Sequence, residues 1–339
     1  MNILYVIGNG LDIAHHMETS YQNFFDHYLT VPTDDNDIRA MKKDIHSRRY
    51  KTWADLEMGL GEYSFNCADK DVFLKCLSDI KEKLRKYLQK ESEKINLYTI
   101  NTISNFINPD QLLEPEPRER YIDYRLRFGS GESINVMTLN YTSTLESLFG
   151  YGNSAKGLSN GVVLHNILHV HGTLDNMMVM GVNDTSQISN TAFNTDIDVV
   201  EEFVKPEFNE ACLNNKNTDC ESLIQNANII VLYGTSLGNS DDKWWKLIGK
   251  RMELDAYPLI VYLPYDEKKD LSAEPNHLRR WTLESIHEIH DKFNIKIDEK
   301  MLYSRICVAF NKTLLPISKL PKQSNKIDIS SSINPRVIK

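Results

Sequence analysis

Largely apolar runs along the chain mark the candidate strands. They cover residues 3–7, 134–139, 162–170, 229–233 and 259–263. Short apolar runs bounded by glycine or polar residues are typical of buried strands. Helical patterns lie between several of them, at 142–149, 219–227 and 241–255. Strand–helix–strand alternation predicts an α/β fold with a Rossmann-like parallel sheet and right-handed crossovers.

A long helical pattern separates the first predicted strand from the second. Between residues 13 and 106, apolar positions recur at three- and four-residue spacing, most clearly at Phe73, Cys76, Leu77, Ile80, Leu84, Tyr87 and Leu88. A compact sheet has short connections, so a segment of this length is expected to form an insertion. We therefore expect one α/β domain over residues 1–310, with a helical insertion at about residues 20–130.

Two further segments differ in composition from the predicted elements. Residues 184–217 are polar and rich in asparagine, which predicts a long loop near the site. Residues 311–339 carry several lysines and an arginine but only one acid, Asp328. That bias predicts a basic, flexible tail.

Charge and cysteine content limit the class of protein. The 339-residue chain has a net charge of -8, which argues against general nucleic-acid binding because phosphate contacts need a basic surface. No apolar run is long enough for a membrane span, and no basic region precedes the first strand, so neither a membrane segment nor a signal peptide is expected. The 5 cysteines form no C-x-x-C pair, so we expect the cytoplasm and no metal site.

The first predicted strand runs directly into a glycine turn and then a helical pattern. Gly8, Asn9 and Gly10 form the turn. Asp12 and His15 follow it in the sequence and lie one helical turn apart in the predicted helix. Glycine lacks a Cβ atom, so its backbone N–H can approach a phosphate. The turn lacks the third glycine of the dehydrogenase fingerprint. Asp12 and His15 either face a ligand or form a structural pair.

Three other polar motifs follow predicted strands. They contain Asn140, His171 and the segment Gly234-Thr235-Ser236-Leu237. The carboxyl ends of parallel strands meet at one edge of a sheet, where open α/β proteins bind their ligands. Histidine titrates near neutral pH and suits a general base. For each residue the alternative is a satisfied polar group at a strand end.

The order of these motifs resembles known families. Residues 8–12, Asn140, His171-Gly172-Thr173 and residues 234–237 resemble the signature segments of the sirtuin-type (DHS-like) NAD/FAD-binding fold. The sequence Ile7-Gly8-Asn9-Gly10-Leu11-Asp12-Ile13-Ala14-His15, followed by Thr19-Ser20-Tyr21, is similar to the AbiH family of bacterial phage abortive-infection proteins. Residues 53–57 and 139–142 also resemble that family, so the similarity covers roughly residues 1–265.

The chain departs from these patterns at specific positions. Leu11 stands where AbiH members usually have phenylalanine, and His16 stands where they have glycine. Sirtuin deacylases carry zinc-binding cysteines and an aspartate two residues after the asparagine. This chain lacks those cysteines and has Thr142 at that position, which argues against protein deacylation.

The resemblance implies an antiphage protein that binds NAD and hydrolyses it with release of nicotinamide. His171 would act as the base and Asn140 would position the water. The phosphates and ribose would be held by Gly8, Asn9, Gly10, Asp12, His15, Gly234, Thr235 and Ser236. The alternative is a non-catalytic nucleotide sensor that switches a partner or a homo-oligomer in response to a phage-derived trigger. A nuclease is disfavoured by the acidic charge.

Overall fold

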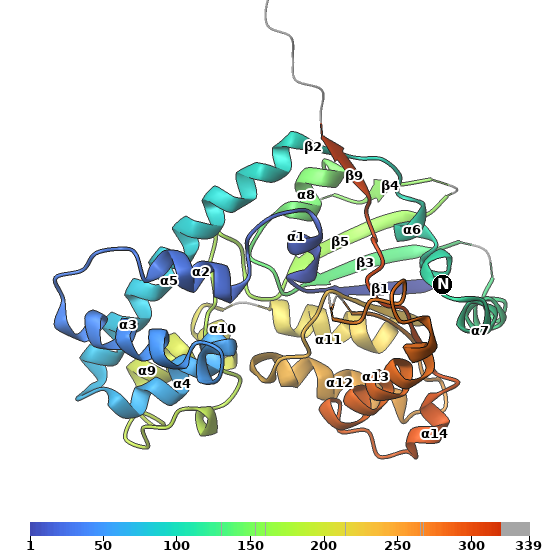
Figure 1. Ribbon diagram of the computed structural model, residues 1–339. Helices are drawn as coiled ribbons and strands as arrows, with labels where there is room; N and C mark the ends of the chain where they lie inside the picture. The colour runs from blue at the N-terminus through green and yellow to red at the C-terminus, as the bar shows by residue number, and fades with distance from the viewer. Residues whose placement is uncertain are drawn as a thin grey trace, which may run out of the picture.

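The computed structural model describes residues 1–129, 131–152, 154–159, 161–213, 215–264, 266 and 268–319. A mostly parallel sheet of 7 strands lies between two layers of helices (Figure 1). Its strands are β1 (Asn2–Ile7), β3 (Ser133–Thr138), β4 (Lys156–Gly157), β5 (Val163–His169), β6 (Ile229–Tyr233), β7 (Leu259–Leu263) and β8 (Ile306–Val308). The α/β prediction is confirmed.

The strand order of the sheet is β4-β5-β3-β1-β6-β7-β8. All neighbours pair in parallel except β4, which runs antiparallel to β5 at one edge. The parallel strands run outward from β1 in one direction as β3 and β5, and in the other as β6, β7 and β8. This is the order of doubly wound dinucleotide-binding sheets, which reverse direction between their first and fourth strands. The reversal of strand order falls between β1 and β6. The sirtuin type of fold stays a prediction.

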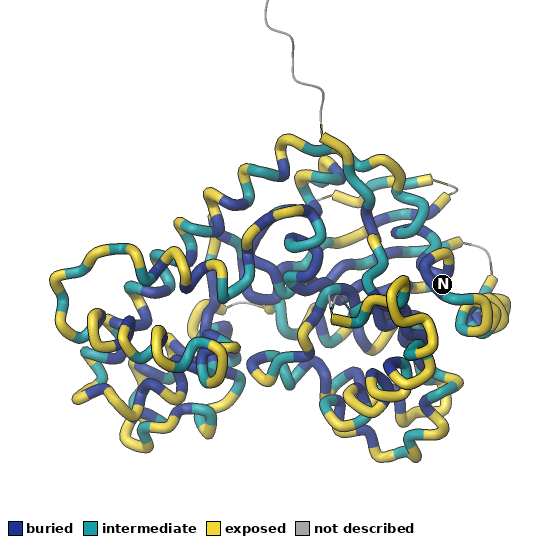
Figure 2. Tube along the Cα trace, in the orientation of Figure 1, coloured by how far each residue is buried: buried dark blue, intermediate teal, exposed yellow. Residues whose placement is uncertain are grey.

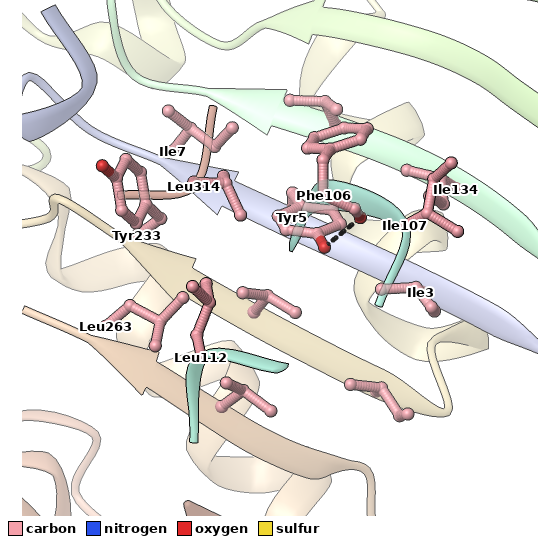
Figure 3. Close-up of a cluster of buried hydrophobic side chains, with 14 of the residues drawn as sticks. Ile3, Tyr5, Ile7, Phe106, Ile107, Leu112, Ile134, Tyr233, Leu263 and Leu314 are labelled. Carbon is pink, nitrogen blue, oxygen red and sulfur yellow. Dashed lines mark hydrogen bonds between the residues drawn. The ribbon is translucent and has the colours of Figure 1, made fainter. Parts of the chain in front are cut away.

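One face of the sheet is covered by α6 (Ser104–Ile107), α7 (Pro115–Arg125) and α8 (Thr144–Phe149). Side chains alternate along a strand, so Ile3, Tyr5 and Ile7 of β1 all point to this face. Tyr5 stacks on Phe106 with 4.5 Å between ring centroids, and its hydroxyl donates to the Phe106 carbonyl at 2.5 Å (Figure 3). This polar end therefore has a partner inside an otherwise apolar cluster.

The other face carries the remaining crossover helices. They are α11 (Lys216–Asn226), α12 (Asp242–Met252), α13 (Leu278–Lys292) and α14 (Glu299–Leu302). Leu4 and Val6 of β1 point into this layer, where Trp245 and Phe293 stack with centroids 5.7 Å apart. β1 is thus buried on both faces, as the central strand of a doubly wound sheet must be.

A second group of helices packs beside the sheet, on the left of Figure 1, with a buried interior of its own in Figure 2. We call it the helical lobe. It consists of α2 (Tyr21–Tyr28), α3 (Asn36–Arg48), α4 (Leu56–Tyr63), α5 (Lys70–Ser92), α9 (Ile197–Phe203) and α10 (Lys205–Ala211). Phe73 of α5 meets Phe203 of α9 edge to face, with 5.1 Å between centroids. The lobe is therefore built from two segments distant in the sequence.

Short elements complete the described chain. They are α1 (Gly10–Ala14), η1 (Thr52–Ala54), η2 (Ser64–Asn66), η3 (Glu93–Leu97), η4 (Pro109–Leu112), η5 (Thr185–Gln187), η6 (Asn239–Asp241), η7 (Pro275–His277), β2 (Tyr98–Ile100) and β9 (Ile317–Lys319). None of the helices in these described ranges is long and apolar enough to cross a bilayer.

The structure differs from the sequence predictions in three segments. α6 and α7 lie in the expected insertion but cover the sheet instead of joining the helical lobe. The expected loop at 184–217 contains α9 and α10, and the apolar side chains Val199 and Phe203 of α9 pack into the lobe. Residues 311–319 belong to the folded body because Leu314 and Leu315 are buried and β9 pairs with β2. The rest of the expected tail, residues 320–339, lies outside the described residues.

Candidate functional site

A pocket of about 730 Å³ opens at the carboxyl ends of β1, β3 and β6, between the sheet and the helical lobe. The loops after these strands form its floor, and residues 51–62 of the lobe contribute part of its wall. It coincides with the reversal of strand order, where this class of sheet binds ligands.

Most of the predicted site residues line this one pocket. They are Gly8, Asn9, Gly10, Asp12, Asn140, His171, Gly234, Thr235 and Ser236. His15 is not among the lining residues. Its Nε2 lies 2.8 Å from the carbonyl oxygen of Leu315, so its imidazole faces the C-terminal segment. The His15 side chain therefore bonds to Leu315, whereas the Asp12 carboxylate bonds to Thr142 and Thr144.

The glycine turn is packed against the loop that follows β6. The N–H of Gly8 donates to the Tyr233 carbonyl at 2.9 Å, and that of Gly10 donates to the Gly234 carbonyl at 2.9 Å. A Cβ atom on Gly10 would lie 2.4 Å from the Cα atom of Gly234. The glycines therefore permit close approach of two backbone loops. Their N–H groups already have acceptors, so the expectation that they bind phosphate directly is corrected.

Unpartnered donors occur instead on the loop after β6. In the described structure, the backbone N–H groups of Thr235, Ser236 and Leu237 have no acceptor, and the buried Thr235 hydroxyl has no hydrogen-bond partner. Gly234 and Leu237 have positive φ angles of 61° and 48°. Leu237 thus holds a conformation that is rare outside glycine, and such strain concentrates at ligand sites.

Asn140 is fixed through several of its polar atoms. Its Nδ2 donates to the Gly8 carbonyl at 3.2 Å, and its N–H donates to the Thr138 hydroxyl at 3.2 Å. The ring Nδ1 of His169 lies 2.8 Å from the Asn140 carbonyl. Among the described residues, Oδ1 of Asn140 has no hydrogen-bond donor. This rigidly held oxygen is available to a water molecule or a ligand hydroxyl.

Asp12 is fully buried in the floor of the pocket. Its two carboxylate oxygens accept from the hydroxyls of Thr142 at 2.6 Å and Thr144 at 2.7 Å. Burial raises the pKa of Asp12 to about 6, although the two threonine hydroxyls partly oppose that effect. Asp12 is therefore still mostly ionised near neutral pH, but it takes up its proton at a higher pH than an ordinary aspartate.

His171 belongs to a buried network of charged side chains. Its Nε2 lies 2.8 Å from Oδ1 of Asp241, and the same oxygen lies 3.1 Å from Nζ of Lys205. Lys205 also donates to Oε2 of Glu57 at 2.9 Å. With Nε2–H donating to Asp241, the neutral imidazole keeps its lone pair on Nδ1, which has no partner in the described structure.

Mutual attraction decides the charge states of the network. Burial alone would raise the pKa of Asp241, but Lys205 and His171 outweigh burial and hold it well below its usual range. Burial would lower the pKa of Lys205, but Asp241 and Glu57 outweigh it and raise that pKa. Burial raises the pKa of Glu57, which Lys205 only partly offsets. Asp241 and Lys205 are therefore charged at neutral pH.

Sequence reasoning missed two members of this network. Asp241 had the position of an ordinary acid at a helix start, and Lys205 lay in a segment predicted to be a loop. Glu57 was noticed only through the resemblance of residues 53–57. No sequence spacing links these residues, because they meet only when the helical lobe packs on the sheet.

Metal ligation has no candidate site in the described ranges, where no three histidine, cysteine or acidic side chains are gathered for an ion. The pocket instead presents hydroxyl groups, amide groups and a histidine paired with a carboxylate.

Two comparisons bear on identity. A search of curated proteins finds no match to this chain. The family model described as bacteriophage abortive infection AbiH matches residues 4–262. The matched span includes the glycine turn, Asn140, His171 and the loop after β6, as well as the whole helical lobe. Since the match covers well over half of the 339 residues, the chain belongs to the AbiH family of bacteriophage abortive infection proteins.

Proposed function

We propose that the protein acts in abortive infection as a NAD glycohydrolase. The observation that carries this proposal is the meeting, in one pocket, of a carboxylate-bound His171, the free Oδ1 of Asn140 and the unpartnered donors of residues 235–237. Together they supply a base, an orienting group for water and contacts for a phosphate.

The binding half of the proposal rests on the place and the donors of the pocket. The switch point of the sheet lies directly beneath it, and its volume of about 730 Å³ falls in the usual range for ligand sites. We place the diphosphate of NAD against the N–H groups of Thr235, Ser236 and Leu237. The buried Thr235 hydroxyl, unpartnered in the described protein, gives a further donor to a phosphate or ribose oxygen.

The catalytic half uses water as the nucleophile. Nδ1 of His171 accepts a proton from that water, directly or through a ribose hydroxyl, while Oδ1 of Asn140 orients it. The water oxygen forms a bond to the anomeric carbon, and the bond from that carbon to nitrogen breaks. Nicotinamide leaves with the electron pair, and ADP-ribose and a proton are the other products.

The transition state of this reaction resembles an oxocarbenium ion, with positive charge on the ribose. Asp241 lies beside His171 and keeps its negative charge. That charge stabilises the imidazolium that forms when His171 accepts the proton of the attacking water. The network beside His171 therefore suits this chemistry.

The test is nicotinamide release from NAD by the purified protein, prepared from uninfected and from phage-infected cells. His171→Ala should reduce release by about a hundredfold, the usual contribution of a general base. His165→Ala, at an exposed position of β5, the strand that His171 follows, is the matched control and should keep full activity.

One result would contradict the mechanism, and another would contradict the hydrolase itself. Full activity of His171→Ala removes His171 from the mechanism. Binding of NAD by the wild-type protein without release in either preparation supports a nucleotide sensor instead.

A further inference from the structure

Lys205 occupies an unusual place for a lysine. It is the first residue of α10, it is only 5% exposed, and three oxygens surround its ammonium group. These are Oε2 of Glu57 at 2.9 Å, the Ser240 carbonyl at 2.8 Å and Oδ1 of Asp241 at 3.1 Å. An ammonium group has three protons, so these contacts use all of its donors and fix its position.

The contact with Asp241 has a consequence for His171. Oδ1 of Asp241 receives both the Lys205 ammonium and Nε2 of His171. Two donors on one carboxylate oxygen restrict rotation of that carboxylate. The orientation and the tautomer of the His171 ring then depend on Lys205, which itself does not line the pocket.

The network also joins the two parts of the molecule. Glu57 lies in α4 of the helical lobe, whereas His171 and Asp241 lie on loops that follow β5 and β6. Oε1 of Glu57 accepts from the Gly181 N–H at 3.2 Å and from the Tyr141 hydroxyl at 3.4 Å, so the glutamate is held by further contacts. Lys205 thus connects an anchored group of the lobe to the carboxylate that holds His171.

Stability alone is a poor explanation for this arrangement. A buried ion pair is expensive to desolvate, and replacing it by apolar or neutral side chains of similar size is often neutral for stability. Exposed pairs on the same lobe, such as Lys75 with Asp35 and Asp37, avoid that cost. A buried lysine that contacts the partner of the proposed base has a stronger rationale in orientation.

We propose that Lys205 is a positioning residue for His171, which it orients through Asp241 and links to Glu57 of the helical lobe. The inference rests on the proposed function for its catalytic meaning. It predicts that the base is correctly oriented only while the lobe is packed on the sheet.

The test uses variants that preserve the fold. Lys205→Met alone leaves two buried carboxylates without their partner, so the main variant is the double substitution Lys205→Met with Glu57→Gln. It replaces the lysine and one of the two acids that the lysine contacts, and the amide oxygen at position 57 can still accept from Gly181. Lys205→Arg keeps a positive charge at this position and is the conservative variant for comparison. Lys75→Met removes an exposed lysine that also bridges two carboxylates, and it is the matched control.

Two measurements separate positioning from a structural role. For nicotinamide release, the double variant should lose about tenfold in kcat with KM within about twofold, and Lys205→Arg should recover part of that loss. Nitrogen NMR of the ligand-free protein, with His171→Gln for assignment, should show one Nε2–H tautomer in the wild type and in Lys75→Met. The double variant should show a mixture of tautomers.

An unchanged tautomer together with unchanged kcat in a folded double variant would overturn the positioning role. The tautomer does not depend on turnover. Absence of nicotinamide release from the wild-type protein would therefore refute the hydrolase, while the tautomer would still decide whether Lys205 orients His171.

Discussion

Asp12 illustrates how a single buried side chain links stability to pH. Its pKa is about 6 in the folded protein, whereas an exposed aspartate has an ordinary pKa of 3.8, because burial disfavours the charged form. The folded state therefore holds this proton more tightly than the unfolded state. The resulting stabilisation is present below about pH 4 and is lost as the pH rises through 6.

Asp12→Asn should remove this pH dependence. Two units of pKa correspond to about 3 kcal/mol, so the free energy of unfolding of the wild type should fall by about 2–3 kcal/mol relative to the variant between pH 4 and pH 7.5. Urea unfolding at the two pH values measures the difference, with the exposed Asp34→Asn as control. A difference between wild type and Asp12→Asn that does not change with pH would contradict the assignment.

Asn140→Ala separates binding from chemistry. The substitution removes the free Oδ1 that is proposed to orient water, while the donors of residues 235–237 remain. We expect nicotinamide release to fall about a hundredfold or more, with NAD affinity by calorimetry changed only a few-fold. Asn135→Ala, on β3 and outside the pocket, is the control. A parallel loss of affinity would instead make Asn140 a ribose-binding residue.

At the scale of elements, the contact between the two loops fixes the shape of the pocket. Gly10→Ala places a Cβ atom 2.4 Å from the Gly234 Cα, so the loops must separate. We expect a loss of about 1–3 kcal/mol in unfolding free energy and weaker NAD binding. Gly157→Ala meets no atom within 4 Å and serves as the control in the same denaturation series. Equal stability of the two variants would show that the loops can separate without loss of unfolding free energy.

The elements differ in how far the sequence predicts them. The strands at 229–233 and 259–263 agree with β6 and β7 because both are continuous apolar runs buried on two faces. α9 and α10 were missed because their segment is mostly polar. Val199 and Phe203 are the buried residues of α9, and Asp196 caps its first turn. Two apolar positions and one cap form too short a pattern to distinguish a helix from a loop in the sequence.

The sequence likewise predicts some residues of the candidate site and not others. Asn140, His171 and Thr235 follow predicted strands, so parallel pairing alone brings them to one edge. Lys205 and Asp241 depend on how the helical lobe packs on the sheet, and no local pattern encodes that contact. The misplacement of His15 has a similar cause, since its partner Leu315 lies 300 residues away.

At the scale of the whole molecule, the segment before β9 crosses the sheet face beside β1. Leu314 is fully buried in the same cluster as Ile7 and Tyr233 (Figure 3). Leu314→Ala should lower the unfolding free energy by about 2–5 kcal/mol because it leaves a cavity in this core. Thermal or urea unfolding measures the effect, with the exposed Thr313→Ala as control. A loss equal to that of the control would place this segment outside the cooperative core.

The central place of β1 also bears on how the protein is made. The ribosome releases β1 first, but its neighbours β3 and β6 begin at Ser133 and Ile229. The glycine turn gains its hydrogen bonds only when Tyr233 and Gly234 are present, and His171 gains its carboxylate only with Asp241. A nascent or prematurely terminated chain that stops before these residues has no assembled pocket. With this topology, the pocket can assemble only after Asp241, the last of these residues, has been synthesised.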